Sequence, residues 1–330
     1  MPDSHPPLQE LNFACPLPAS TSDRVLLAHG GGGRMQRKLI TELFRAQFQS
    51  PELARDHDGA LLSPRPGVTL AFTTDAYVVT PRFFPGGDIG SLAVHGTVND
   101  LAACGARARW MSVSFILEEG FLLEELARIV ASMAAAARRA GVAIVTGDTK
   151  VVERGKADGL FVSVTGVGEL LGEPAPSPDR VRPGDRILLT GPIGLHGMAI
   201  MSQRENLGFE SEELLSDSAP LGELIASVYE AGIRPSCLRD PTRGGVAATL
   251  SEIAQTAAVG MILQEEAIPI PRVVQGACEI LGLDPLLVAN EGKMLVLVAP
   301  ADESRTLAVL RSHPLGRDAV AVTSVAGDGA

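Results

Sequence analysis

Four aspartates lie at the ends of apolar runs or beside glycines, where carboxylates commonly take part in binding or catalysis. They are Asp75 in FTTDAY, Asp100 in TVNDLA, Asp148 in TGDTK and Asp240 in LRDPTRGG. Proteins use oxygen ligands from separate segments to hold Mg²⁺ that also binds the phosphates of a nucleotide. One such aspartate alone is more readily a helix cap or a turn residue. Four together, accompanied by a glycine-rich loop, indicate a binding site.

Two lysines form the second group of candidates, because lysine is scarce in this chain. Of its 28 basic residues only four are lysines, and the pKa of an ammonium can be moved toward neutrality whereas that of a guanidinium cannot. Lys150 in GDTK and Lys293 in NEGK each stand in a short polar motif between apolar strands. Lys150 beside Asp148, and Glu291 beside Asn290, could supply a phosphate clamp and a proton acceptor. The alternative for each is a structural ion pair.

The glycine-rich loop is Gly30 to Gly33, between a strand predicted from Val25 and a helix predicted in RMQRKLITELFRAQF. Because glycine has no Cβ atom, backbone N–H groups of such a loop can approach a phosphate at an electropositive helix N-terminus. No Gly-Lys-Ser or Gly-Lys-Thr follows, so the loop is not a Walker A motif, and it also lacks the GxGxxG spacing of a dinucleotide site. A flexible turn is the alternative interpretation.

Strands and helices alternate along both halves of the chain, which predicts an α/β protein. The clearest helix runs from Leu122 to Ala140, with apolar residues three or four positions apart and Gly141 as its cap. Strands are predicted at LAFTTDAYVV, RWMSVSFILEE, FVSVTGVGEL and KMLVLVAP. Proline and glycine at turn density mark a boundary at 172–185. We predict three parts: a disordered tail at 1–23, a first domain at 24–175 and a second α/β domain at 176–330.

Composition excludes several classes of protein. The formal net charge of −11 repels phosphodiester backbones and no basic run is present, so nucleic acid is not an expected partner. The apolar stretches are far shorter than the ~20 residues that span a bilayer, and the chain starts without the basic and apolar regions of a signal peptide. We therefore expect a cytoplasmic protein without a membrane segment. The four cysteines form no CxxC pair, which favours buried free thiols over a zinc or redox site.

A set of motifs in a fixed order carries a resemblance to a known family. LAHGGGGRM, FTTDAYVV, FFPGGDIG, GTVNDLAACGA, GDTKVV, LRDPTRGG and NEGK follow one another from about residue 25 onward. In these motifs the chain resembles the HypE family of nickel–iron hydrogenase maturation factors. That family belongs to a superfamily with aminoimidazole ribonucleotide synthetase, selenophosphate synthetase and thiamine monophosphate kinase. GDTKVV and RDPTRGG are the more specific motifs.

The resemblance implies two α/β domains of the aminoimidazole ribonucleotide synthetase type, with N-terminal strands that form a β-barrel at a homodimer interface. It implies ATP bound with Mg²⁺ in a cleft at that interface. Carried over position by position, the metal ligands match Asp75, Asp100 and Asp240, and the catalytic residues match Lys150 and Glu291. The implied nucleotide contacts are Gly30, Gly31, Gly32, Gly33, Asp75, Asn99, Asp100, Gly147 and Asp148.

The activity that the resemblance implies is ATP-dependent dehydration of a protein S-carboxamide to a thiocyanate, which supplies cyanide to the iron of the hydrogenase. An amide oxygen is a poor leaving group, so ATP would first convert it into a phosphate ester. Glu291 or a neutral Lys150 would then take the N–H proton as phosphate leaves. The implied partners are the carbamoyltransferase HypF and the HypC–HypD scaffold complex.

The chain departs from the family pattern at its end. The family carries the carboxamide on the cysteine of a C-terminal Pro-Arg-Ile-Cys tail, and the 330 residues end at Ala330 without that motif. We therefore expect this chain to lack its own acceptor cysteine. Two other hypotheses stay open: another ATP-dependent kinase or synthetase of the superfamily, and a tailless binding partner without catalysis.

Overall fold

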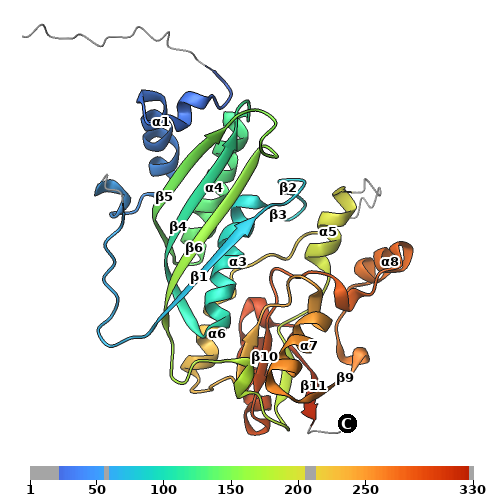
Figure 1. Ribbon diagram of the computed structural model, residues 1–330. Helices are drawn as coiled ribbons and strands as arrows, with labels where there is room; N and C mark the ends of the chain where they lie inside the picture. Colours follow the sequence, from blue (N-terminus) through green and yellow to red (C-terminus); the bar gives the residue numbers. More distant parts are fainter. Residues whose placement is uncertain (1–21, 56–58, 205–212, 327–330) are drawn as a thin grey trace, which may run out of the picture.

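A computed structural model describes residues 22–55, 59–204 and 213–326 (Figure 1). Two larger sheets organise these residues, one in each half of the chain. The tail predicted at 1–23 lies almost entirely outside the described residues. Within them, no helix is both long enough and apolar enough to cross a membrane.

The N-terminal half is built on a four-stranded sheet in the order β1-β6-β4-β5. β6 pairs antiparallel with β1 and with β4, whereas β4 pairs parallel with β5. Buried and less buried residues largely alternate along β4, as expected for a strand with one face against a core. The strands are β1 (Leu70–Tyr77), β4 (Ala106–Glu118), β5 (Ala143–Val152) and β6 (Leu160–Leu170), beside a short pair, β2 (Phe83–Phe84) and β3 (Gly87–Asp88).

Two helices, α3 (Ile89–Ala103) and α4 (Leu123–Arg139), cover one face of this sheet (Figure 1). α3 begins after Asp88, whose carboxylate accepts a hydrogen bond of 2.7 Å from a backbone N–H of the first turn. α4 has glutamates in its first turn and arginines in its last, as the helix dipole favours. Its position confirms the predicted helix. α3 is buried on almost every side, so Asp100 near its end has a rigid support.

The opposite face of the four-stranded sheet is exposed. Phe72 on β1 is 69% exposed and Ile116 on β4 is 41% exposed. Asp148 and Lys150 on β5 are exposed on the same face. Among the described residues, the outer strands β1 and β5 each pair with a strand on one side only. An open face that carries exposed apolar side chains, on a sheet whose outer strand edges have no partner, is a typical place for another chain to bind.

The segment before the first helix differs from the prediction. A strand is predicted from Val25, but the described chain forms only an isolated bridge there, followed by a 3-10 helix at Leu27–Gly30. Gly30 lies so close to β5 that a Cβ atom would be 2.7 Å from the backbone nitrogen of Val151. The predicted helix is present in three consecutive parts: α1 (Arg34–Leu39), a π-type part (Ile40–Arg45) and α2 (Ala46–Phe48).

The GDTK motif is also placed differently. The prediction treats it as a polar motif after a strand, but residues 147–150 continue β5 and pair with β4. β4 extends to Glu118 and offers backbone partners along the whole motif. Pairing with a neighbouring strand therefore overrides the local preference for a turn.

The C-terminal half contains a five-stranded antiparallel sheet in the order β8-β10-β7-β11-β9. Its strands are β7 (Arg186–Leu189), β8 (Cys237–Arg239), β9 (Gly260–Leu263), β10 (Leu295–Val298) and β11 (Val320–Ala326). Its helices are α5 (Leu195–Arg204), α6 (Gly222–Glu230), α7 (Gly245–Ala257), α8 (Arg272–Leu281) and α9 (Glu303–Ser312). The sequence patterns do not predict α6, α8 or β9. α6 packs against α3 and β4, which joins this half to the other.

Candidate active site

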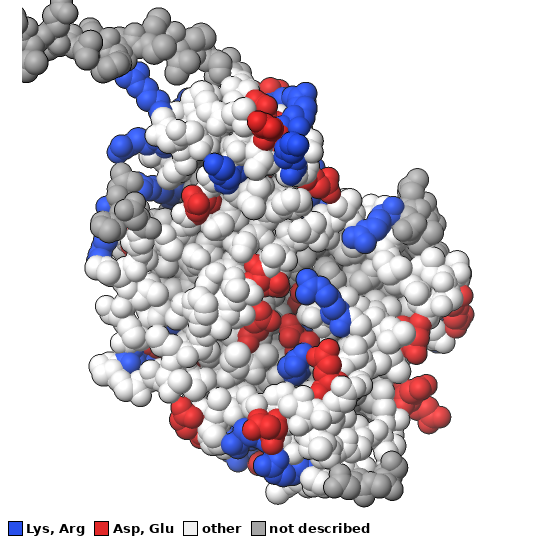
Figure 2. Space-filling view, viewed as in Figure 1, with Lys and Arg blue, Asp and Glu red and all other residues white. Residues whose placement is uncertain are grey.

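Five carboxyl groups line one cavity of about 630 Å³ between the two halves. One of them is Asp284, and the other four are residues that the sequence predicts for a site. Asp75 comes from β1, Asp100 from α3, Asp240 from the loop after β8, and Glu291 from the loop before β10. Figure 2 shows acidic side chains gathered in the hollow at the middle of this face. The structure brings together the three predicted metal ligands and one of the two predicted catalytic residues.

Burial raises the pKa values of three of these carboxyl groups, Asp100, Asp240 and Glu291, and repulsion from neighbouring carboxylates adds to the rise. Burial, followed by repulsion from Asp240, raises the pKa of Asp100 to about 6. Burial raises the pKa of Glu291 to about 8, with added repulsion from Asp240, Asp75 and Asp100. The pKa of Asp240 is also raised by burial. Gathered negative charge of this kind is stabilised by a bound cation.

Protein groups hold two of these carboxylates in place. The hydroxyl of Thr73 donates a 3.0 Å hydrogen bond to Asp100, and the backbone N–H of Ala76 donates one of 2.7 Å to Asp75. Within the described ranges, no three His, Cys, Asp or Glu side chains stand close enough to enclose a metal ion by themselves. A cation at this site would therefore need phosphate oxygens or water molecules as its remaining ligands, as Mg²⁺ commonly does.

A second cavity, of about 450 Å³, adjoins the same acids. Asp100, Asp240, Thr242 and Arg243 line both cavities, so the acids stand between two spaces that could take different substrates. Arg243 is a cation that opposes the rise in the pKa of Glu291. The sequence prediction names neither Thr242 nor Arg243. Both lie in the RDPTRGG motif that contains Asp240. The position of Arg243 next to two glycines was the signal that could have identified it.

The glycine-rich loop and the GDTK motif lie elsewhere in the chain. Gly32, Gly147 and Asp148 line a separate cavity of about 530 Å³. Asp75 and Gly147 fall in one row across the sheet, on its two outer strands. Three inter-strand spacings therefore separate them, roughly 14 Å. Within one chain, neither these residues nor Lys150 lie at the acids.

Asn99 is buried and lines none of the three cavities described above. Its side-chain amide donates to the carbonyl oxygens of Ala219 and Glu291, both at 3.1 Å, and accepts from the backbone N–H of Leu221 at 2.7 Å. Because these bonds use both ends of the amide, the side chain joins α3 to two loops of the C-terminal half. These bonds give Asn99 a structural role, and its predicted role as a nucleotide contact stays a prediction.

Lys293, the other lysine singled out in the sequence, is buried as well. Its Nζ lies 2.5 Å from Oδ2 of Asp217 and donates to the carbonyl oxygen of Gly292 at 3.2 Å. Lys293 lines neither cavity that contains the acids. Of the two interpretations left open for this lysine, the structural ion pair is the correct one.

Comparison with known proteins identifies the class that this fold and site define. Residues 56–170 match the N-terminal domain of AIR synthase related proteins, and residues 182–329 match their C-terminal domain. The two-domain α/β fold of that class is confirmed.

More specific similarity is found with HypE proteins. The carbamoyl dehydratase HypE of Bradyrhizobium diazoefficiens is 54% identical over 303 residues, which cover 92% of this chain and 87% of that relative. A crystal structure of HypE in complex with ATP matches with a TM-score of 0.89 at 50% identity, covering 92% of this chain and 90% of that one. A crystal structure of a HypE–HypF complex matches with a TM-score of 0.77 at 45% identity, covering 88% and 93%. The chain belongs to the HypE family.

Proposed function

We propose that this chain is an ATP-dependent carbamoyl dehydratase of nickel–iron hydrogenase maturation. The observation that carries the proposal is the convergence of Asp75, Asp100, Asp240 and Glu291 on one cavity, in a chain of the HypE family. The reaction requires carboxylates that can hold Mg²⁺ against a transferring phosphoryl group, and a base that titrates near neutrality. Glu291, with a pKa of about 8, is such a base.

The three aspartates suit Mg²⁺, because they are oxygen ligands whose burial and mutual repulsion raise the pKa of Asp100. Asp75, Asp100 and Asp240 would hold the ion together with phosphate oxygens and water. When bound, Mg²⁺ neutralises the charge that develops during phosphoryl transfer.

The chain's own residues then account for the dehydration. The carboxamide oxygen attacks the γ-phosphorus of ATP, ADP leaves, and one N–H proton is released to give an O-phosphorylated imidate. The carboxylate of Glu291 takes the remaining N–H proton while the C–O bond breaks. Phosphate departs with the amide oxygen and the S-carboxamide becomes a thiocyanate. Arg243, which lines both cavities, is placed to attract the phosphate groups.

A homodimer would add Lys150 and Asp148 to the same site. β1, which carries Asp75, and β5, which carries Gly147 to Lys150, are the outer strands of one sheet, and the outer edge of each has no partner strand in the described part of the chain. Pairing β1 of one protomer with β5 of a second copy closes two such sheets into a barrel and brings Lys150 of the partner subunit near Asp75. The glycine-rich loop packs on β5 and would be carried there with it.

Protein partners follow from the family. A relative 45% identical to this chain has been crystallised as a HypE–HypF complex, and we propose a HypF-type carbamoyltransferase as the protein that delivers the carboxamide. The HypC–HypD complex, which the sequence resemblance implies, would receive the product.

Supplying the carboxamide on a separate peptide tests this function. The chain is incubated with ATP, Mg²⁺ and a peptide that ends in Pro-Arg-Ile-Cys and bears an S-carbamoyl group on its cysteine. We expect mass spectrometry to show loss of one water from the peptide for each ADP formed, and D75N and D240N to abolish both.

Two other outcomes would contradict the proposal. ADP release that requires a free small molecule and ignores the peptide would indicate another kinase or synthetase of the superfamily. Hydrogenase maturation that proceeds unchanged with D75N and D240N would indicate a binding partner without catalysis.

A further inference from the structure

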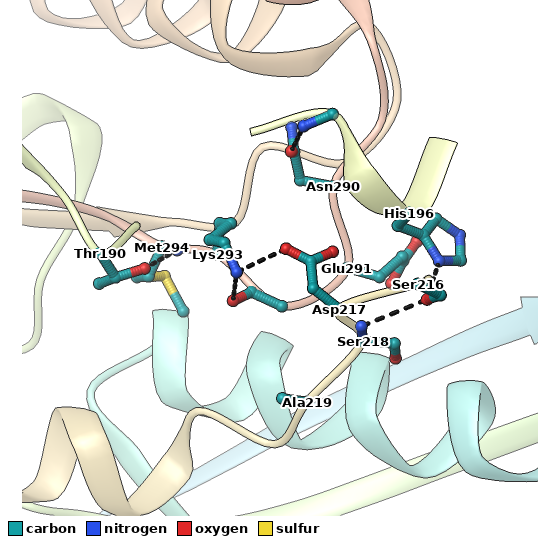
Figure 3. A network of polar contacts seen from close by, with 12 residues as sticks. Thr190, His196, Ser216, Asp217, Ser218, Ala219, Asn290, Glu291, Lys293 and Met294 are labelled. Carbon is teal, nitrogen blue, oxygen red and sulfur yellow. Dashed lines mark hydrogen bonds and ion pairs between the residues drawn. The ribbon is translucent and has the colours of Figure 1, made fainter. Parts of the chain in front are cut away.

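Residues 216–219 form a short segment that links the two halves beside the candidate site (Figure 3). Each residue of this segment has a partner on another element. The pairs are Ser216 with His196, Asp217 with Lys293, Ser218 with His95, and Ala219 with Asn99. His95 and Asn99 belong to α3, His196 to α5, and Lys293 to the loop before β10. The 216–219 segment therefore connects elements of both halves that carry or flank the acids.

The ion pair between Asp217 and Lys293 is the charged link in this segment. The two side chains are 15% and 10% exposed. Apart from this ion pair, the carboxylate oxygens of Asp217 have no hydrogen-bond partner among the described residues. Lys293 is thus the counter-charge on which the buried carboxylate depends, and removing one member of such a pair is costly.

The same contacts hold the backbone of Glu291 from two sides. Gly292 packs so tightly against the 216–219 segment that a Cβ atom would lie 1.9 Å from the carbonyl oxygen of Asp217. Lys293, the next residue, is tied to Asp217 through its side chain. On the other side, Asn99 donates a 3.1 Å hydrogen bond to the carbonyl oxygen of Glu291. The loop that carries Glu291 is therefore fixed both to α3 and to the 216–219 segment.

We propose that Asp217 is a positioning residue, which through its ion pair with Lys293 holds the carboxyl group of Glu291 in place relative to Asp100 and Asp240. Asp217 lines neither cavity that contains the acids, so it acts through Glu291 and not on a substrate. This role rests on the proposed function, because the position of Glu291 matters to turnover only if Glu291 takes part in the reaction.

The substitution D217N tests this role, because asparagine keeps the size of the side chain and removes its charge. The matched control is E230Q, which removes the charge of the exposed pair between Glu230 and Arg107, 3.0 Å apart, that also joins the two halves. In the full chain with ATP, Mg²⁺ and the carbamoylated peptide, we expect D217N to lower kcat about tenfold or more. We expect KM for ATP to stay within about threefold, because the aspartates are untouched, and E230Q to change neither constant.

A double substitution separates positioning from an independent effect. If Asp217 acts through Glu291, D217N combined with E291Q is no slower than E291Q alone. Effects that multiply would overturn the inference, and so would a kcat for D217N equal to that of the unsubstituted chain.

Amide hydrogen exchange gives a second measurement that does not depend on turnover. Loss of the ion pair should speed exchange of residues 289–294 by about tenfold in D217N but not in E230Q. Unchanged exchange in D217N would overturn the positioning role whatever the activity. Absence of ADP formation by the unsubstituted chain would instead count against the proposed function, and the exchange data would still decide the role of Asp217.

Discussion

Among the carboxyl groups of the candidate site, Glu291 has a strongly raised pKa. Burial and three neighbouring aspartates raise its pKa to about 8. In the pH range between its ordinary pKa and that value, the folded chain holds a proton that the unfolded chain releases. Stability from this group is therefore present at low pH and is lost as pH rises toward 8. The site is least stable, when metal-free, near the pH at which it would work.

The raised pKa of Glu291 predicts that the stability of the metal-free chain depends on pH and that one substitution removes this dependence. When a chelator keeps the chain metal-free, its free energy of unfolding should fall between pH 6.5 and 8 by up to about 1.4 kcal/mol per pH unit. In the E291Q variant this dependence on pH should be much weaker. Burial lowers the pKa of His95 and of His196 to about 4, so their opposite contribution lies below this window. Urea unfolding at several pH values measures the slope. An equal slope in E291Q would contradict the assignment.

Substitution of Asp100 should raise the stability of the metal-free chain but abolish its binding of ATP with Mg²⁺. Its pKa of about 6 reflects burial and repulsion from Asp240 and Asp75, so D100N should raise the melting temperature of the metal-free chain at pH 8. The same substitution should abolish the stabilisation that ATP with Mg²⁺ confers. Thermal unfolding with and without the nucleotide and metal measures both effects. A D100N chain that is still stabilised by ATP and Mg²⁺ would show that Asp100 is not a ligand.

At the scale of elements, β5 couples the glycine-rich loop to the sheet. Gly30 approaches the backbone of Val151, whereas Gly33 has open space where a Cβ atom would lie. G30A should therefore destabilise the chain by about 1–3 kcal/mol through overpacking, and G33A should change stability little. Chemical unfolding of the two variants measures the difference. Equal stability of G30A and G33A would contradict the close packing of the loop on β5.

The elements that the sequence predicts well are those with a strong periodic pattern. α4, β1 and β4 follow from the spacing of their apolar residues, and the acids Asp75 and Asp100 follow from their positions on such elements. The strand predicted from Val25 fails because the chain there packs against β5 as a 3-10 helix. The extension of β5 through GDTK depends on a distant partner strand, which local sequence does not encode.

Among the site residues too, some are identified from local sequence and others only from contacts with distant residues. Asp240 and Glu291 stand out as polar residues in short motifs, and the structure places both at one cavity. Asn99 looks like a ligand contact in sequence, yet its hydrogen bonds join loops more than a hundred residues away. Asp217 gives no sequence signal, because its partner Lys293 is distant along the chain and is recognised only once the fold is known.

At the scale of the whole molecule, one chain holds Asp75 and the GDTK motif on opposite edges of a sheet. The proposed dimer makes each site from Asp75 of one protomer and Lys150 of the other. Mixing D75N chains with K150A chains, each inactive alone, should then restore about one quarter of the activity, since half of the dimers contain one intact site. Subunit exchange followed by the ADP assay measures it. No recovery after confirmed exchange would contradict a shared site.

The central claim is that ATP activates the oxygen of the carboxamide, and the fate of that oxygen tests it most directly. The carbamoylated peptide is prepared with a heavy-oxygen label in its amide and incubated with the chain, ATP and Mg²⁺. The account predicts that the label appears in the released inorganic phosphate, one atom for each thiocyanate formed, and that E291Q slows its appearance. Label recovered in water or retained in the peptide while ADP accumulates would contradict phosphorylation of the amide oxygen.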